Sequence, residues 1–298
     1  MYYINGIIVI NKEKGYTSHD VVAKVKRILG LKKVGHTGTL DPNATGVLPL
    51  LLNDGTKLSK YLIEHDKEYV VTLKFGIKTD TADIEGNVIN EDSFRIQEKS
   101  KEDIEKVLEK FVGVNMQTPP AYSAIKVNGK KLYEYAREGK LDNTLIKPRQ
   151  IEIYEIDLIN INNEENEIKF RVSCSKGTYI RSLCEDIAKE LNTIGYMKDL
   201  NRTQVGRFSI DKAVTVDELE NKKNDINFIN EHIISIKDFF NEYRNIILED
   251  IELKKFLNGI EISVEQNDGI VNIYNNEAYI GIGIVNNKKL KREIVIKM

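Results

Sequence analysis

The stretch GHTGTLDPNATGVLPL, residues 35–50, organises the rest of this chain. Its three glycines can adopt backbone angles that other residues avoid, so a tight and irregular path is open to it. Pro42 biases Asp41 towards an extended conformation and keeps a helix from running through the loop. Residues 47–52 are apolar, which predicts a strand buried on both faces. The pattern favours a carboxylate on a stiff loop anchored to the core. The plainer interpretation is an Asp-Pro turn that only connects two elements.

The length and composition of the chain indicate a globular protein with one large domain and one small domain. Of its 298 residues, 41% are hydrophobic and 30% are charged. Its apolar runs are shorter than the roughly 18 residues of a membrane span, and its N-terminus does not have the pattern of a signal peptide. We therefore expect a cytoplasmic protein that makes no contact with membranes.

The cysteines and histidines give no pattern of cross-links or metal ligands. Cys174 and Cys184 are too few for a disulfide framework, and neither lies in a Cys-x-x-Cys pair. The four histidines are scattered and do not have the spacing of metal ligands on a helix or a hairpin. The sequence therefore predicts a protein without a metal.

The charge of the chain is segregated although its formal net value is only −2. Residues 11–41 and residues 123–150 each carry seven Lys or Arg against three Asp or Glu, and residues 286–298 carry five against one. One basic face on a nearly neutral protein is able to bind phosphates. These charge runs are also compatible with a solvated surface that has no partner.

Residues 117–139 combine tyrosines with basic side chains. Aromatic rings offer stacking surfaces and cations hold phosphates, which is how proteins grip RNA outside regular helices. A surface hairpin followed by a short helix would have a similar composition, so the pattern alone leaves both interpretations open.

Apolar periodicity predicts several further elements. Residues 67–75 alternate as a strand that includes Tyr69, and residues 151–161 form a strand with a predicted bulge near Glu155. Thr178 is expected to cap a helix with Arg181 in its first turn, where a cation opposes the helix dipole by roughly 0.3–1 kcal/mol. That unfavourable position indicates an anionic partner. From Tyr243 onwards, one short helix and four short strands predict a small β-rich domain.

Four motifs make the chain resemble the TruB-type tRNA pseudouridine-55 synthases over nearly all of residues 4–215. They are GHTGTLDPNATGVLP, QTPPAYSAIK with its downstream YEYAREG, SKGTYIRSL, and LNRTQVGRF. The resemblance implies an α+β fold, with a pseudouridine synthase-like, mixed and largely antiparallel sheet flanked by helices. The expected domains are a catalytic domain at residues 1–240, with an RNA-gripping insertion at 116–147, and a PUA-like RNA-binding domain at 241–298.

The resemblance also implies a reaction and the residues that carry it out. The reaction is the isomerisation of uridine to pseudouridine at position 55 in the T-loop of tRNA, with base flipping and without a cofactor. Asp41 would be the catalytic aspartate, Arg181 its partner, and Tyr69 the ring that stacks on the base. The residues expected to bind substrate are Leu200, His36, Lys126, Lys130, Lys131 and Tyr179. We expect a monomer that needs no protein partner.

Some alternatives stay open at this point. Tyr69 taken alone is typical of a core residue, and a histidine in a glycine-rich turn, such as His36, often only bonds nearby backbone. As a whole, the chain could be an RNA-binding or RNA-folding protein in which catalysis is incidental or lost. A glycoside-cleaving enzyme is a weaker alternative, because no motif supplies the second carboxylate that it would need.

Overall fold

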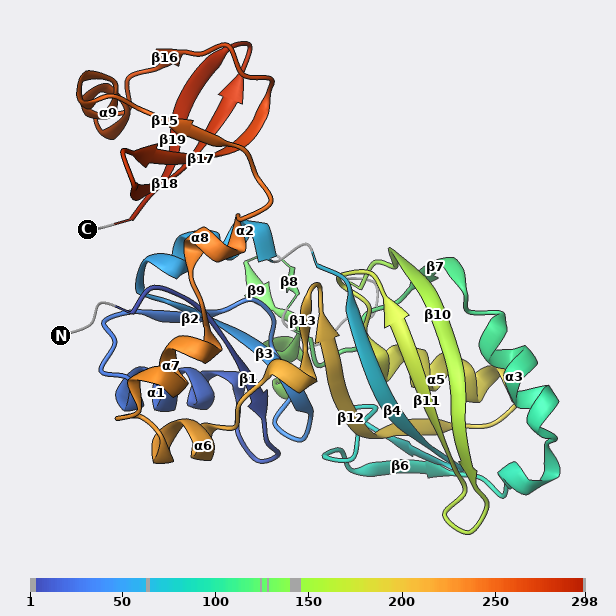
Figure 1. The fold of residues 1–298 in the computed structure, drawn as a ribbon. Coiled ribbons are helices and arrows are strands. Elements are labelled where there is room, and N and C mark those ends of the chain that lie inside the picture. Colours follow the sequence, from blue (N-terminus) through green and yellow to red (C-terminus); the bar gives the residue numbers. More distant parts are fainter. Residues whose placement is uncertain (1–3, 63–64, 124, 128, 140–145, 297–298) are drawn as a thin grey trace.

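A computed structural model describes residues 4–62, 65–123, 125–127, 129–139 and 146–296. Figure 1 shows a larger body built around a central sheet and a small β-rich domain at the C-terminal end of the chain. Ten described strands form the large sheet, and eight of them follow one path. In that order they are β14 (Ile233–Ile234), β1 (Gly6–Lys12), β3 (Thr45–Leu52), β12 (Gly195–Val205), β4 (Lys67–Phe75), β11 (Glu167–Cys174), β10 (Arg149–Asn162) and β7 (Gly113–Gln117). Off this path, β2 (Val34–His36) pairs with β3, and β13 (Phe208–Ser209) pairs with β12.

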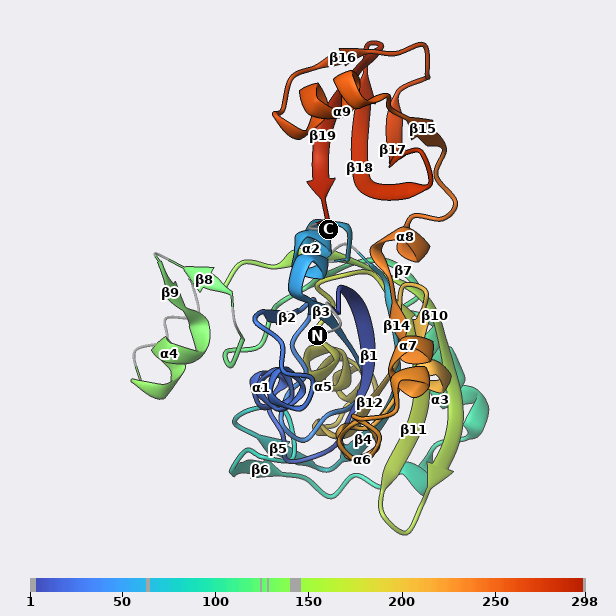
Figure 2. The same ribbon diagram turned by 60° about the vertical axis from the view of Figure 1, so that its left-hand side comes forward.

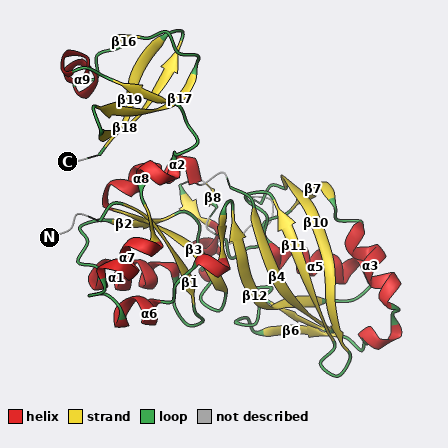
Figure 3. Cartoon of the chain, viewed as in Figure 1, coloured by secondary structure: helices red, strands yellow, loops and turns green. Residues whose placement is uncertain are grey.

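Helices cover the sheet in separate groups, as the colouring by secondary structure makes plain (Figure 3). One apolar cluster joins β1 and β3 to α1 (Ser18–Ile28), α6 (Val216–Asn221) and α7 (Ile226–His232). A second joins β4, β10 and β11 to α3 (Lys101–Glu109) and α5 (Ile180–Glu190). The remaining short elements of the body are η1 (Asn53–Leu58), α2 (Ser59–Leu62), β5 (Ile77–Thr79), β6 (Val88–Glu91), η2 (Ile96–Glu98), β8 (Lys126–Val127), β9 (Lys130–Lys131), α4 (Leu132–Arg137), η4 (Ile210–Lys212) and α8 (Ile236–Phe239). The predicted α+β class with a largely antiparallel sheet is confirmed.

Local sequence signals explain several of these elements. Thr17 caps α1 in a capping box with Asp20, and in β4 every second side chain from Tyr69 to Phe75 is buried. The bulge predicted near Glu155 is present, because the pairing of β10 with β11 shifts between Ile153 and Glu155. The prediction for Thr178 was wrong. Tyr179 is the N-cap of α5, and the Thr178 hydroxyl instead donates to the Ser175 carbonyl 2.9 Å away.

Within the large sheet, β3 and β12 form the one parallel pair among the described named strands. Their pairing is short, with Asn201 opposite Thr45 and Arg202 opposite Gly46. Gly46 has a φ of +105°, and a Cβ there would lie 2.2 Å from the carbonyl oxygen of Arg202. The two strands can approach this closely only because position 46 has no side chain. The loop that carries Asp41 ends at this contact.

The C-terminal domain has a five-stranded sheet and one helix, α9 (Asp250–Leu257). Its strands are β15 (Asn245–Ile247), β17 (Gly269–Asn275), β18 (Ala278–Asn286), β19 (Lys289–Val295) and β16 (Ile262–Ser263), in spatial order. The predicted β-rich domain is confirmed, although the sequence did not reveal β15 and β19 begins earlier than expected. The domain packs on the body: Ile282 and Ile294 join an apolar cluster with Phe240, and Glu293 accepts from the Tyr61 hydroxyl at 3.1 Å.

The expected RNA-gripping insertion takes the form of a small hairpin and a helix. Figure 2 shows β8, β9 and α4 projecting away from the sheet. Residues 124, 128 and 140–145 of the predicted insertion lie outside the described residues. In the described ranges we find no helix with both the length and the apolar character that a membrane span requires.

Gly46→Ala should destabilise the fold by about 3 kcal/mol, because the new methyl group collides with the backbone of β12 in addition to the strain of a positive φ. Gly113→Ala is the matched control, since Gly113 has a φ of +96° and open space where a Cβ would lie. It should cost only about 1 kcal/mol. Urea unfolding followed by circular dichroism measures both values. Equal losses in the two variants would show that the close approach of β3 and β12 is not the constraint.

Candidate active site

The loop between β2 and β3 holds Asp41 in a fixed place. The Ser18 hydroxyl accepts from the amide of Leu40 at 2.9 Å and donates to its carbonyl at 3.2 Å. The carbonyl of Pro42 accepts from the Gly15 amide and from Lys12 Nζ, each at 3.0 Å. Backbone groups on both sides of Asp41 are therefore bonded to β1 and to the start of α1. The prediction that the loop is anchored to the core is confirmed.

Arg181 faces Asp41 from the first turn of α5. Its Nε lies 3.4 Å from Asp41 Oδ2, and its Nη1 lies 3.4 Å from Asp83 Oδ2. The Arg181 side chain is 11% exposed and that of Asp83 10%, whereas that of Asp41 is 38% exposed. One buried guanidinium thus lies between a buried carboxylate and a carboxylate that remains open to solvent.

Backbone carbonyls fix the other side of the Arg181 guanidinium. Nη2 donates to the carbonyl of Tyr122 at 3.0 Å, and Nη1 donates to that of Thr81 at 3.3 Å. Four acceptors from three segments of the chain therefore orient one guanidinium, which matches the planar fork of its donors.

The QTPPAYS motif is hydrogen-bonded to the start of α5. The Gln117 side chain accepts from the amide of Tyr179 at 2.8 Å and donates to its carbonyl at 3.0 Å. The Ser182 hydroxyl donates to the carbonyl of Thr118 at 2.8 Å. The helix lacks a side-chain cap at Tyr179, so these bonds hold the turn that carries Arg181.

Tyr69 and Leu200 lie on adjacent strands beside the loop. Leu200 and Asp41 line the same small cleft, together with Asn43, Ala44, Asp83, Ile84, Glu85, Met197, Lys198 and Asp199. Tyr69 is buried, and that burial raises the pKa of its hydroxyl to about 12, against a smaller opposing effect of the adjacent Arg202. The structure therefore brings Asp41 and Leu200 to one cleft and pairs Arg181 with Asp41, while Tyr69 lies in the apolar cluster that also contains Ala44 and Leu200.

The other predicted binding residues are dispersed. His36 packs edge-on against His19 with ring centroids 5.4 Å apart, and burial lowers its pKa, with smaller effects of His19 and Arg202 in the same direction. Tyr179 is half-buried at the N-cap of α5, where burial raises the pKa of its phenol against a smaller opposing effect of Ser123. Neither of these two residues lines the cleft of Asp41.

The three predicted lysines lie on the projecting hairpin. Lys130 pairs with Glu138, and its ammonium lies 5.0 Å from the centre of the Tyr135 ring. The backbone amide of Lys131 donates to Glu134 at 2.9 Å. Lys126 is in β8, and its side chain is outside what the structure describes.

Lys12 is a fully buried cation beneath the Asp41 loop. Its Nζ donates to the carbonyls of Glu13 and Pro42, at 2.9 and 3.0 Å. Burial lowers its pKa from 10.5 to about 8, and the charge of Asp41 opposes that change. A lysine that bonds the loop backbone in this way contributes to its rigidity.

Comparisons with known proteins identify the family. Residues 26–180 match the model of the TruB family pseudouridylate synthase N-terminal domain, and residues 181–264 match that of the tRNA pseudouridylate synthase B C-terminal domain. The chain belongs to the TruB family of pseudouridylate synthases. It is therefore an enzyme, an isomerase that forms pseudouridine in RNA, and the family predicted from the four motifs is confirmed.

Two relatives extend the match over nearly the whole chain. The tRNA pseudouridine synthase B of Francisella philomiragia is 42% identical over 290 residues, which cover 96% of this chain and 93% of the relative. That of Caldanaerobacter subterraneus is 39% identical over 291 residues, 97% of this chain and 98% of the relative.

Solved structures share the fold at lower identity. An archaeal box H/ACA ribonucleoprotein complex of Nop10 and Cbf5 aligns with a TM-score of 0.68 and 24% identity, over 98% of this chain and 86% of the other. An H/ACA ribonucleoprotein bound to a substrate RNA that contains 2′-deoxyuridine gives a TM-score of 0.68 and 22% identity, over 98% and 85%. At such identities the likeness shows the fold alone.

Sequence reasoning missed several polar residues around the TruB-family site. Asp83, Gln117 and Arg202 bond the segments that carry Asp41 and Arg181, and Lys12 supports the loop from below. Gln117 and Arg202 lie within the motifs quoted above, and this location is the signal by which the sequence could have identified them. Asp83 lies outside the quoted motifs, and its partner Arg181 is far away in sequence, so no local pattern marked it.

The buried amine of Lys12 predicts a pH dependence of stability. Between pH 8 and 10.5 the folded protein has largely lost this proton whereas the unfolded chain keeps it, so stability from this group rises with pH across that window. In the wild type, Lys12 should raise the free energy of unfolding by about 3 kcal/mol across this pH range, and this rise should be absent in Lys12→Met. Urea unfolding at a series of pH values measures this difference.

The exposed neighbour Lys14 offers the matched control. Its ammonium is paired with Asp199 at 2.8 Å, and its side chain is more than half exposed. Lys14→Met should therefore keep the wild-type rise in stability between pH 8 and 10.5. Parallel curves for the wild type and Lys12→Met would contradict the assignment.

Proposed function

We propose that this TruB-family enzyme isomerises the uridine at position 55 in the T-loop of tRNA, in the cytoplasm, with Asp41 as its catalytic carboxylate. The observation that carries the proposal is the ion pair between Asp41 and Arg181, in which a half-exposed carboxylate lies against a nearly buried guanidinium. The names of the two relatives, both tRNA pseudouridine synthase B, support tRNA as the substrate.

The main catalytic group that this reaction needs from the protein is one well-placed carboxylate. The N1–C1′ bond of uridine breaks, the uracil turns in place, and C1′ bonds to C5, which loses its proton while N1 gains one. Atoms and electrons balance without a second substrate. A carboxylate beside the sugar acts as a base or as a nucleophile in this sequence. Arg181 supplies the countercharge and aims the carboxylate.

Tyr69 and Leu200 are proposed to receive the flipped base. Leu200 lines the cleft beside Asp41, and Tyr69 packs in the same apolar cluster as Leu200 and Ala44, where its ring would stack on a uracil inserted next to the carboxylate. The cleft encloses only about 10 Å³, far below the usual volume of a ligand pocket, so a uracil fits only after the rim of the cleft has moved. We propose that the exposed Ile84 and Glu85 at its rim shift when the base is bound.

The projecting hairpin is proposed to contact the phosphates of the T-arm. Lys126, Lys130 and Lys131 lie on β8 and β9, away from the body, where an RNA arm can reach them (Figure 2). Lys130 is paired with Glu138, so an RNA phosphate has to replace this carboxylate. Tyr179 and His36 are proposed to contact RNA beside the cleft, and the C-terminal domain to add binding surface.

Asp41→Asn should abolish pseudouridine formation while the loop remains folded. Asparagine is nearly isosteric and can still bond Arg181, but it cannot act as a base or a nucleophile. The affinity for tRNA should change by no more than about tenfold, or roughly 1.4 kcal/mol, because other residues hold the RNA. Pseudouridine mapping on an unmodified transcript and filter binding measure the two quantities.

Asp217→Asn, on the exposed first turn of α6, is the matched control and should keep full activity. If Asp41→Asn still makes pseudouridine, Asp41 has a structural role and the proposal fails. If the wild type binds unmodified tRNA tightly but never modifies it, the RNA-folding alternative replaces the assignment to position 55.

Arg181→Lys should lower kcat about 100-fold because a lysine cannot bond Asp41, Asp83 and two carbonyls from one planar group. Arg171→Lys on β11 is the control, since Arg171 pairs with Glu68 and Asp157 in a partly exposed network outside the cleft. Single-turnover rates and thermal unfolding are measured for both. Near-normal turnover of Arg181→Lys would refute the role of the ion pair.

A further inference from the structure

Arg202 is a buried cation at the junction of the two halves of the sheet. It lies on β12, opposite Gly46 of β3 on one side and Tyr69 of β4 on the other. Its side chain is only 2% exposed. A guanidinium at such a depth requires an explanation, because removing a charge from water is costly.

The donors of Arg202 reach both ends of the loop that carries Asp41. Nε donates to the carbonyl of Val47 at 2.8 Å, and Nη2 donates to the carbonyl of Gly38 at 3.2 Å. These two acceptors lie nine positions apart and flank Asp41. One side chain therefore fixes the distance between the start and the end of the loop.

The hydroxyl of Tyr69, on the neighbouring strand β4, also interacts with this guanidinium. Burial lowers the pKa of Arg202, and the interaction with Tyr69 opposes that change. In the described part of the chain, the electrostatic partner of Arg202 is this hydroxyl and no carboxylate. An ion pair therefore does not explain why an arginine is buried at position 202. The fixed set of N–H donors on its guanidinium does explain it.

We propose that Arg202 is a positioning residue that sets the Asp41 loop and the Tyr69 ring at the spacing the reaction needs. The inference rests on the proposed function of Asp41 and Tyr69. Arg202 itself does not touch the substrate. Its role is to connect the carboxylate that acts on the nucleotide with the ring that receives the base, through hydrogen bonds to Gly38 and Val47 and through its place beside Tyr69 on the paired strand.

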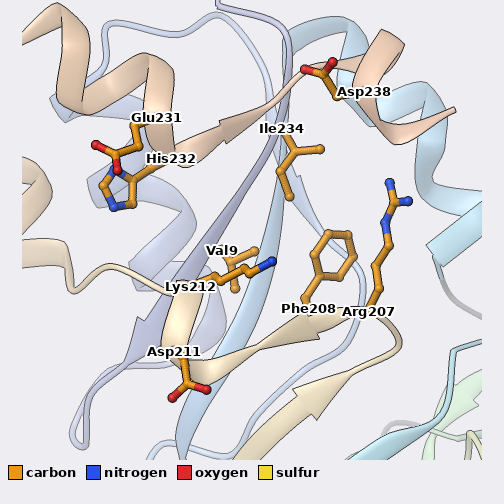
Figure 4. A pocket seen from close by; sticks show the side chains of 9 residues that line it. All are labelled: Val9, Arg207, Phe208, Asp211, Lys212, Glu231, His232, Ile234 and Asp238. Atoms are coloured by element: carbon orange, nitrogen blue, oxygen red, sulfur yellow. The ribbon is translucent and has the colours of Figure 1, made fainter. Parts of the chain in front are cut away.

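Arg202→Lys keeps a positive charge but offers a single ammonium that cannot span both carbonyls. We expect kcat to fall about 100-fold, as for a displaced catalytic group, while KM for tRNA stays within about threefold. Arg207→Lys is the matched control, because Arg207 donates to the carbonyl of Phe239 at 2.9 Å and borders a different pocket with Val9, Phe208 and Lys212 (Figure 4). It should keep the wild-type kcat.

Hydrogen exchange gives a readout that does not depend on catalysis. The amides of Leu40 and Ala44 are bonded inside the loop, to Ser18 and to the carbonyl of Asp41. In Arg202→Lys these amides should exchange faster, while the amide of Leu183 in α5 should not change. Faster exchange over the whole sheet would instead mean general destabilisation and would overturn the proposal.

Chemical rescue tests the need for the fork itself. In Arg202→Ala, added methylguanidinium should restore part of kcat, whereas the same addition should not restore Asp41→Asn.

Unchanged kcat and unchanged loop exchange in Arg202→Lys would overturn the proposal. If no Arg202 variant folds, the wild type decides: exchange at Leu40 and Ala44 as slow as in β12 supports the clamp, and exchange as fast as in surface loops refutes it.

These outcomes separate the inference from the proposed function. If Asp41→Asn remains active, the catalytic assignment fails whatever Arg202 does. If Asp41→Asn is inactive but Arg202→Lys is normal, only the positioning role is lost.

Discussion

The close approach of β3 to β12 at Gly46 is the constraint on which the site depends. It joins the strands that pack with α1, α6 and α7 to those that pack with α3 and α5. Because a side chain at Gly46 would collide with β12, the loop before it ends at one defined point. Asp41 is thereby held next to the junction of β3 and β12, where it pairs with Arg181 from α5.

The cations around this junction hold the loop backbone in place more than they neutralise carboxylates. Arg181 is shared by two carboxylates, but Lys12 and Arg202 direct their donors to backbone carbonyls of the loop. Each buried cation has a desolvation cost, and hydrogen bonds to the loop backbone offset part of it. The result is a carboxylate whose surroundings are organised before any RNA arrives.

The sequence was sufficient for the class of the fold, most elements and the loop. Caps such as Thr17 and the alternation in β4 are local signals, and the motifs pointed to Asp41, Arg181 and Leu200. Asp83 could not be assigned a partner, because its contact with Arg181 depends on a turn and a helix distant in sequence. The cap at Thr178 was wrong because its hydroxyl closes the preceding turn. The roles of the predicted site residues stay predictions that biochemistry can test.

The apolar cluster shared by the C-terminal domain and the body has a consequence for synthesis of the chain. Ile282 and Ile294 cover Phe240 and its neighbours, and Glu293 binds Tyr61 near the end of α2. A nascent chain that has not yet released β19 from the ribosome leaves this surface of the body uncovered. The body therefore completes its packing only after β19 has left the ribosome, and a chain without β19 exposes apolar side chains of the body that favour aggregation.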